Sequence, residues 1–477
     1  MRRVLFNSYE FLLAFLPIVV AGYFLFNGLG PRLRGGDNAG GGGNAGNLWL
    51  VAASYFFYAW WRPEFIGLLV ASTAVNFVVG RAIVHRAVQN RPTTALLVAG
   101  IAFDLLLLGY FKYANFFFEN EARLFSAAPI HLDVILPIGI SFFTFTQIAF
   151  LVDAHKRKAR EPDAVNYSLF VTFFPHLLAG PILHHREMMP QFADRANKSV
   201  QWDNVARGLA LLALGLGKKV LIADALSPQV ADAFSAGAPL TFGDAWLAVL
   251  CYTMQIYFDF SGYTDMALGM AQMMNIRLPV NFDSPYRQRN LQEFWRHWHM
   301  TLTRFLRDYV YIPLGGNRRG EAWTAFAIVV TFLLGGLWHG ANWTFVAWGL
   351  ANGVGLVLLR LWGRTGIALP AFAAWAITFL FVNLAWVLFR APDLATAGSF
   401  LASLSGVHGF GAVRMAIVPL TIPTLAIACV LSMMPRNSNR IAAEARLGWP
   451  LQAATALILA AGILSVGNPT EFLYFNF

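Results

Sequence analysis

Long apolar runs alternate with shorter polar stretches along nearly the whole chain. A membrane-spanning helix needs about 20 consecutive, mostly apolar residues. Stretches of this kind lie near residues 9–27, 48–61, 64–80, 93–118, 134–152, 164–182, 205–223, 245–273, 322–338, 342–362, 368–389, 411–434 and 448–466. Because some of them are short, we expect broken or re-entrant helices among roughly 10 to 13 crossings. The pattern predicts an all-α polytopic membrane protein, since the alternating decamers typical of an outer-membrane barrel are absent.

The composition agrees with this pattern. Of the 477 residues, 57% are apolar and 13% are charged, and the mean hydropathy is +0.54. A soluble globular protein carries about 25% charged residues. We find no repeat and no appended soluble domain, so residues 1–477 are predicted to form a single membrane domain. Its one low-complexity stretch, residues 35–47, is rich in glycine and is predicted to be a flexible loop after the first helix.

Basic residues account for the formal net charge of +10, and they collect in a few loops. These loops cover residues 81–91, 156–160, 277–319, 360–364 and 436–446. By the positive-inside rule they face the cytoplasm, whereas residues 119–133, 231–244 and 391–397, which are poor in Lys and Arg, face the other side. Topology and contact with anionic membrane lipids explain the charge, so no nucleic-acid partner is expected.

Residues 283–319 depart from the apolar pattern, because seven Arg, three acidic residues, two His and seven aromatic residues fall within 37 positions. Asn290, followed by Glu293, is typical of a helix N-cap with its capping-box partner. The stretch 313–317, with its proline and glycines, is a stop signal. We therefore predict one helix from about Leu291 to Tyr311, lying on the membrane surface or dipping into the protein from the cytoplasmic side, where a charged cosubstrate could dock.

Two histidines lie in apolar, tryptophan-rich surroundings, His299 next to Trp298 and His339 next to Trp338. A neutral imidazole in such a place can accept a proton from a hydroxyl group, as a general base does. The alternative is a histidine that is hydrogen-bonded across helices for packing alone. His297 lies about 200° around a helix from His299, so the two cannot share a metal ion on an unbroken helix, and no metal site is predicted.

Two carboxylates, Asp259 and Asp265, fall inside the apolar stretch 245–273. A charged side chain at bilayer depth costs about 2.5 to 3.5 kcal/mol, so each must face protein or water. One interpretation is that they line a polar cavity. The other, which we favour from the residues alone, is a buried pair with one of the arginines between Arg277 and Arg307.

Several longer motifs, in this order along the chain, resemble the membrane-bound O-acyltransferase (MBOAT) superfamily, and in particular the branch of the bacterial alginate O-acetylation membrane protein. The motifs occupy residues 5–10, 173–181, 255–265, 279–286, 294–299, 306–317, 336–340 and 474–477. Relatives in this family usually carry Arg where His297 stands and Gln where His176 stands, so neither histidine is given a role.

The resemblance implies a funnel or tunnel through the bilayer of the bacterial inner (cytoplasmic) membrane, with His339 and His299 as its catalytic residues. It also implies a cytoplasmic acyl thioester, acetyl-CoA or another, as cosubstrate, with no permanently bound cofactor. The acyl group would pass to a cell-surface polysaccharide, through a periplasmic SGNH-type acetyltransferase as partner.

We assign the remaining candidate residues on the same basis. The donor's negative charges would be met by Arg287, Arg289, Arg296, Arg304 and Arg307. The cavity would be lined by Trp298, Trp338, Asn342, Tyr257, Asp259 and Asp265. The leading hypothesis is a membrane-bound O-acyltransferase, most simply an O-acetyltransferase. The alternative is a membrane transporter or channel in which the buried histidines relay protons.

Overall fold

The computed structural model describes residues 5–29, 45–159, 163–411, 413, 417–466 and 472–473. Within these ranges every regular element is a helix, so the predicted all-α class is confirmed. The chain divides into two compact units. Unit 1 comprises Met1–Leu216, Tyr263–Pro279 and Ala442–Glu471, and unit 2 comprises Gly217–Gly262, Val280–Ile441 and Phe472–Phe477. The single domain predicted for residues 1–477 stays a prediction.

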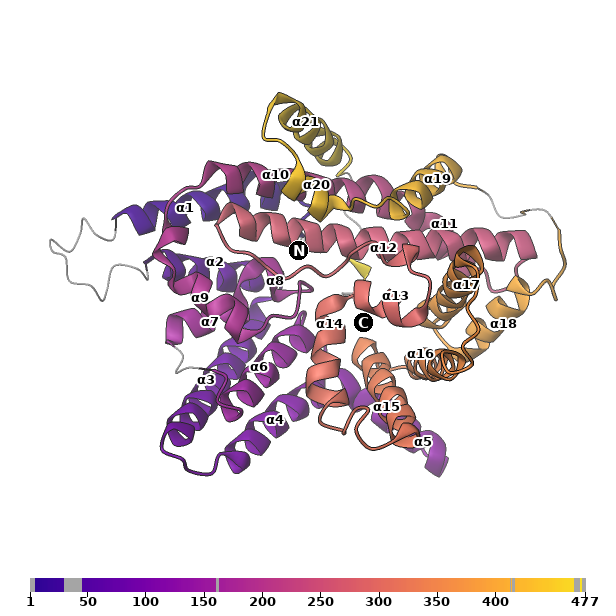
Figure 1. The fold of residues 1–477 in the computed structure, drawn as a ribbon, viewed down its shortest axis with the longest axis horizontal. Coiled ribbons are helices and arrows are strands. Elements are labelled where there is room, and N and C mark those ends of the chain that lie inside the picture. The colour runs from indigo at the N-terminus through magenta and orange to yellow at the C-terminus, as the bar shows by residue number, and fades with distance from the viewer. Residues whose placement is uncertain are drawn as a thin grey trace. The chain divides into compact units, whose positions relative to one another are not determined.

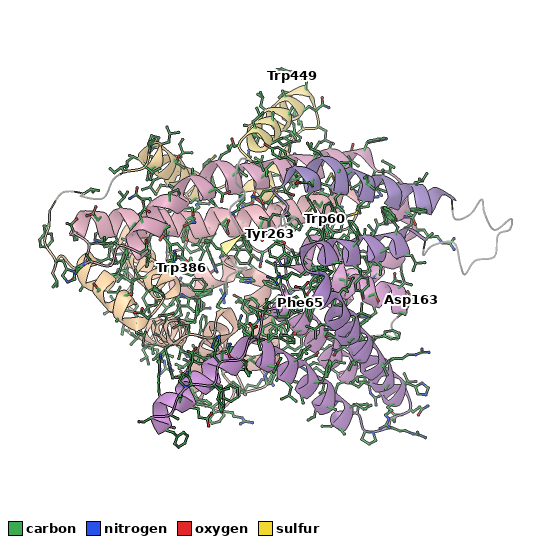
Figure 2. All side chains as sticks on the ribbon, turned by 180° about the vertical axis from the view of Figure 1, so that it is seen from behind. Trp60, Phe65, Asp163, Tyr263, Trp386 and Trp449 are labelled. Carbon is green, nitrogen blue, oxygen red and sulfur yellow. The ribbon has the colours of Figure 1, made fainter. Side chains whose placement is uncertain are left out.

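Unit 1 contains the first half of the chain. Its elements are η1 (Phe11–Phe15), α1 (Leu16–Leu29), α2 (Ala45–Trp61), η2 (Pro63–Phe65), α3 (Ile66–Val88), α4 (Thr94–Leu108), η3 (Gly109–Tyr113), α5 (Ala114–Phe125), α6 (Ile140–His155), α7 (Ala164–Thr172), α8 (Phe174–Leu177), α9 (His185–Ala193), η4 (Arg195–Lys198), α10 (Trp202–Gly217) and α21 (Trp449–Leu464). Helices α3, α4 and α6 lie side by side (Figure 1). Trp449 lies at the exposed start of α21 (Figure 2).

Unit 2 contains the two predicted catalytic histidines. Its elements are η5 (Lys218–Ala223), α11 (Asp224–Phe234), the first two thirds of α12 (Phe242–Met273), η6 (Pro285–Arg287), α13 (Leu291–His297), α14 (Met300–Leu306), η7 (Arg307–Tyr311), α15 (Glu321–His339), α16 (Trp343–Trp362), α17 (Ala371–Arg390), α18 (Leu394–Leu404) and α19 (Thr421–Ser432). The short helix α20 (Ser438–Glu444) falls at the boundary between the units. Trp386 of α17 lies among the helices of unit 2 (Figure 2).

Among the described residues, six helical stretches are long and apolar enough to cross a membrane. They are Phe11–Gly28, Pro63–Val88, Thr94–Phe125, Glu321–His339, Trp343–Trp362 and Ala371–Arg390. Shorter apolar helices cover Ile140–His155, Leu394–Leu404, Thr421–Ser432 and Trp449–Leu464. The predicted stretch 164–182 is broken after α7, where Phe173 leaves the helical region with ψ of 110°. Every predicted stretch contains helix, as apolar runs of this length favour.

Two boundaries from the sequence are wrong. Most of the predicted glycine-rich loop, residues 35–44, lies outside the described residues, but its last three residues form the first turn of α2. The reason is Asn47, which is buried and donates hydrogen bonds to Asn166 Oδ1 (2.7 Å) and to the Phe192 carbonyl (2.9 Å). The second error is the predicted helix from Leu291 to Tyr311, which is interrupted at residues 298 and 299.

Glycines hold α15 and α16 close together. A Cβ atom on Gly336 would meet the Phe345 carbonyl oxygen, and one on Gly349 would meet the Phe332 carbonyl oxygen. Small residues allow two membrane helices to approach until their backbones touch, which increases packing contacts where lipid gives no hydrophobic driving force. The close approach carries His339, the last residue of α15, against the side chains of α16.

We expect Gly336→Ala to lower the thermal unfolding temperature of the detergent-solubilised protein, because the added methyl group meets a backbone carbonyl that cannot rotate away. Overpacking of this kind costs about 1–3 kcal/mol. Gly398→Ala in α18 is the matched control, since a Cβ atom there meets nothing within 4 Å. It should leave the unfolding temperature unchanged or raise it slightly. Equal melting of both variants would show that the crossing is not tightly packed.

Candidate active site

The break between α13 and α14 places His299 in the interior of unit 2. Asn290 begins α13 as predicted, because its side-chain oxygen accepts the Glu293 backbone N–H at 2.8 Å. Trp298 is extended, and His299 has φ of 43° and ψ of 52°, in the left-handed region. A residue with a side chain adopts this conformation at a cost of about 1–2 kcal/mol. The surrounding structure must therefore hold it there.

Asn281 makes several of the hydrogen bonds that stabilise this backbone conformation. Its backbone carbonyl accepts the Met300 N–H at 3.0 Å, and its side-chain oxygen lies 3.2 Å from the Thr301 nitrogen and 3.1 Å from His299 Nδ1. The backbone N–H of Asp283 also donates to the His297 carbonyl at 3.0 Å. The segment 280–283 thus provides partners for backbone groups at the break.

His299 is 1% exposed, and its ring packs at 90° to the ring of Phe260 with 4.8 Å between their centroids. Burial lowers the pKa of His299 to about 3, because the charged form loses its hydration. The ring is therefore neutral near pH 7 and is able to accept a proton or a hydrogen bond.

His339 ends α15 inside a cluster of aromatic side chains, which we call the aromatic cage: Trp338, Phe345, Trp348, Trp386 and Phe389. Its ring centroid lies 5.0 Å from those of Trp338 and Phe389 and 5.2 Å from that of Trp348. Trp386 extends the cage by contacts with Trp348 and Phe389. The helix ends here because Gly340 is extended, with φ of −166° and ψ of 151°.

The two imidazole rings are neighbours, with 6.4 Å between their centroids and 57° between their planes. They come from different elements, His299 from the break before α14 and His339 from the end of α15. The sequence predicted both residues, but their distance follows only from the packing of these elements. A reacting group placed between the rings could contact both.

A cavity of about 760 Å³ in unit 2 reaches His339. From α15 it is lined by Ile328, Thr331, Phe332, Gly335 and His339, which are spaced so that they form one stripe along the helix. With a rise of 1.5 Å per residue, this stripe is about 16 Å long. The cavity therefore follows α15 toward its N-terminal end, and it is long enough to hold an extended, narrow substrate.

Three arginines line the cavity, and each is paired with a carboxylate. Arg296 pairs with Glu293, and Arg307 pairs with Asp308 through contacts of 2.7 and 3.2 Å. Arg360 donates two hydrogen bonds of 2.9 Å to Glu321, the first residue of α15. Glu321 and His339 stand about 27 Å apart along the helix. One cavity thus joins three arginines to the His339 imidazole.

The other predicted donor-binding residues lie elsewhere. Arg287, Arg289 and Arg304 are not among the residues that line the cavity. Arg287, the last residue of η6, and Arg289 are both exposed. Arg304 falls in α14 beside the cavity-lining Thr303.

The residues predicted to line the cavity lie in different places. Trp298 and Trp338 are buried in the aromatic packing around the histidines, and Tyr257 packs against Trp298 with 6.2 Å between ring centroids. Asn342 caps α16 by accepting the Thr344 N–H at 3.0 Å, and it donates to the Pro392 carbonyl. None of these lines the 760 Å³ cavity. They support the walls around the histidines.

The prediction that Asp259 pairs with an arginine is wrong. Asp259 is 1% exposed and pairs with Lys219 of η5 at 2.6 Å, and its second oxygen accepts the Leu473 N–H at 2.9 Å. Lys219 also contacts Asp224 at 2.7 Å. Asp265 is buried as well, but it belongs to unit 1.

Sequence reasoning missed Arg360, Trp348 and Asn281. Arg360 and Trp348 belong to α16, whose sequence is an ordinary apolar helix pattern. Only the structure shows that these two residues line the cavity. Asn281 belongs to the motif 279–286, which was used for the resemblance without a role for this residue.

Comparison with known proteins agrees with the geometry. The sequence model of the membrane-bound O-acyltransferase family matches residues 101–395. The peptidoglycan O-acetyltransferase of Helicobacter pylori is 38% identical over 530 aligned positions, which cover 99% of this chain and 98% of the relative. A probable alginate O-acetylase of Pseudomonas putida, AlgI, is 37% identical over 99% of this chain and 100% of its own. The teichoic acid D-alanyltransferase of Streptococcus thermophilus is 28% identical over 48% of this chain and 57% of its own.

This chain belongs to the membrane-bound O-acyltransferase family. It is an O-acyltransferase and a multi-pass membrane protein, and the resemblance of its motifs to this family is confirmed. These relatives favour an enzyme over the alternative of a transporter or channel.

Because the pKa of His299 lies below its ordinary value of about 6.5, the unfolded chain binds a proton that the folded chain does not. The free energy of unfolding should therefore fall as the pH decreases below about 6.5, by up to about 1.4 kcal/mol per pH unit from this residue. His299→Gln should remove that part of the pH dependence in thermal unfolding between pH 6.5 and 5. Trp386→Phe, which alters the aromatic cage without removing a titrating group, should lower stability similarly at each pH. A wild-type slope in His299→Gln would contradict a neutral, buried ring.

Proposed function

We propose that this O-acyltransferase transfers an acetyl group from an acyl thioester, with acetyl-CoA as the simplest donor, toward hydroxyls of a cell-surface polysaccharide. The observation that carries the proposal is the cavity that joins three arginines to His339. Guanidinium groups bind phosphates through several hydrogen bonds, and phosphates are the charged part of such donors. The narrow, 16 Å stripe along α15 suits the uncharged arm that carries the thioester.

In the proposed reaction, the neutral imidazole of His339 takes the proton of the acceptor hydroxyl as its oxygen attacks the thioester carbonyl. The tetrahedral intermediate collapses, the carbon–sulfur bond breaks, and the leaving thiolate takes the proton back from the imidazolium. His299, whose ring centre is 6.4 Å away, orients the donor or polarises its carbonyl. Trp295 and Trp348, which line the cavity, limit the access of water and so hydrolysis of the thioester.

The direction of transfer is also part of the proposal. Arg318 and Arg319, just before α15, and Arg360, in the last turn of α16, belong to the basic loops, which the positive-inside rule assigns to the cytoplasm. His339 ends α15 on the opposite side, where the intervening loop from Gly340 to Asn342 is uncharged. This arrangement supports a donor that enters from the cytoplasm of a bacterial inner membrane. The acceptor is then a polysaccharide hydroxyl or the serine of a periplasmic SGNH-type partner.

His339→Ala should lower the rate of acetyl transfer at least about 100-fold, because general base catalysis typically contributes about 10² to 10⁴-fold. The measurement is the transfer of labelled acetyl groups from acetyl-CoA to the acceptor. It uses the purified protein in detergent or in vesicles, together with its acceptor. His408→Gln, which changes an exposed histidine of unit 2, is the control and should keep the wild-type rate. A fully active, normally folded His339→Ala protein would refute the assigned base.

Arg360→Gln should raise the KM for acetyl-CoA about 10-fold while kcat changes little, because the arginine binds a part of the donor that does not react. One hydrogen-bonded charge pair is worth about 1.5–3 kcal/mol. Arg319→Gln removes a nearby charge that stacks on Trp323 and does not line the cavity. If both variants raised the KM equally, general surface charge and not the cavity would bind the donor.

A further inference from the structure

The environment of His299 contains a determinant of its protonation that neither the family nor the relatives assign. Asn281 is completely buried, and its side-chain oxygen is shared by three groups. These are the Thr301 backbone nitrogen at 3.2 Å, Thr301 Oγ at 3.0 Å and His299 Nδ1 at 3.1 Å.

The backbone contact identifies the atoms. The Thr301 N–H can only donate, so the Asn281 atom that faces it must be the amide oxygen and not the amide nitrogen. That oxygen can only accept. The ring nitrogen that shares it, His299 Nδ1, must then carry the hydrogen. In a neutral ring this leaves the basic lone pair on Nε2.

The ring cannot readily exchange the two nitrogens by rotation. Phe260 of α12 packs perpendicular to it, and Trp338 and His339 of α15 lie 6.0 and 6.4 Å from its centre. Among these ring contacts His339 is the titratable neighbour, whereas α12 contributes an apolar ring. The His299 backbone is fixed as well, because segment 280–283 forms hydrogen bonds with the His297 carbonyl and the Met300 N–H on either side of it.

We propose that Asn281 is a positioning residue for acyl transfer, which holds His299 in the tautomer with a hydrogen on Nδ1 and presents Nε2 as a hydrogen-bond acceptor. Polarising a carbonyl would need a donor, so this tautomer favours the orienting role of His299. This inference rests on the proposed function, in which His299 acts beside His339. Asn281 does not contact the substrate in this proposal. It acts by orienting the ring and by keeping its neutral form, because an amide oxygen accepts a hydrogen bond without adding a full negative charge.

The test is Asn281→Asp, which keeps the size and the three acceptor contacts and adds a charge 3.1 Å from Nδ1. A carboxylate at this distance favours the imidazolium ion and raises its pKa by about one unit or more. The acid limb of the kcat profile should therefore move to higher pH by about one unit or more. The shift is measured on the acid limb, because the pKa of the wild-type ring is about 3 and lies far below neutral pH. An unshifted acid limb would overturn the proposal.

The matched control is Asn383→Asp. Asn383 is also completely buried in unit 2, and its side-chain oxygen accepts a hydrogen bond from Thr253 Oγ at 2.7 Å. The Asn383→Asp substitution makes the same chemical change away from the imidazoles. It should leave the acid limb of the kcat profile at the wild-type pH. An equal shift in both variants would assign the effect to buried charge in general and would contradict a specific role for Asn281.

Asn281→Ser guards against failure of the aspartate variant to fold. The shorter side chain cannot reach all three donors, so kcat should fall about 10-fold or more with little change in the KM for the donor. Wild-type kcat in this variant would overturn the proposal. The His339→Ala result separates the two levels of inference, because an active His339→Ala protein defeats the proposed function. If the His339→Ala protein is inactive but the acid limb of Asn281→Asp is unshifted, only the role of Asn281 is refuted.

Discussion

Burial of a histidine ring among aromatic side chains disfavours its charged form, and the rest of the site in unit 2 depends on this constraint. His299 and His339 are 1% and 4% exposed, and aromatic rings surround both. In this environment the hydrogen-bond partner of a neutral ring decides which of its nitrogens carries the hydrogen. For His299 that partner is Asn281, which is neutral. A neutral partner fixes the tautomer without attracting a proton to the ring.

Backbone geometry brings the two rings together. His299 reaches the interior because the helix stops at His297 and restarts at Met300, and the strained residue between them is the histidine itself. Strained backbone persists where the surroundings hold it from several sides, which is common at active sites. His339 reaches the same place because glycines bring α15 against α16 and because α15 ends at that residue. The pair therefore depends on one helix break and one helix end.

Much of this could be predicted from the sequence, for physical reasons that differ from residue to residue. Long apolar runs predict helices because the bilayer requires them, and the Asn290 cap is a local signal that the structure confirms. The motifs identified the family, and they are the basis for predicting both histidines as catalytic residues. The break at His299 could not be predicted from periodicity, because residues 291–311 read as a continuous helix and the competing hydrogen bonds come from Asn281, ten or more positions away. The pairing of Asp259 with Lys219 is likewise a tertiary contact, since arginines and lysines were equally available in the sequence.

The arginines that line the cavity, and Asp259 on α12, are paired with opposite charges. Toward the cationic end of the cavity, Arg296, Arg307 and Arg360 each have a carboxylate partner, and on α12 the Asp259 carboxylate is paired with Lys219. Opposite charges in contact cancel most of their field at a distance, so neither group strongly favours or opposes a proton on the imidazoles. Desolvation then dominates at His299 and keeps its ring neutral. Under the proposed function, a phosphate-bearing donor would change this balance only at the arginines, where its phosphates would compete with Glu293, Asp308 and Glu321. Donor binding would then depend on the arginines of the cavity and the protonation of His299 on Asn281, so that separate groups govern the two.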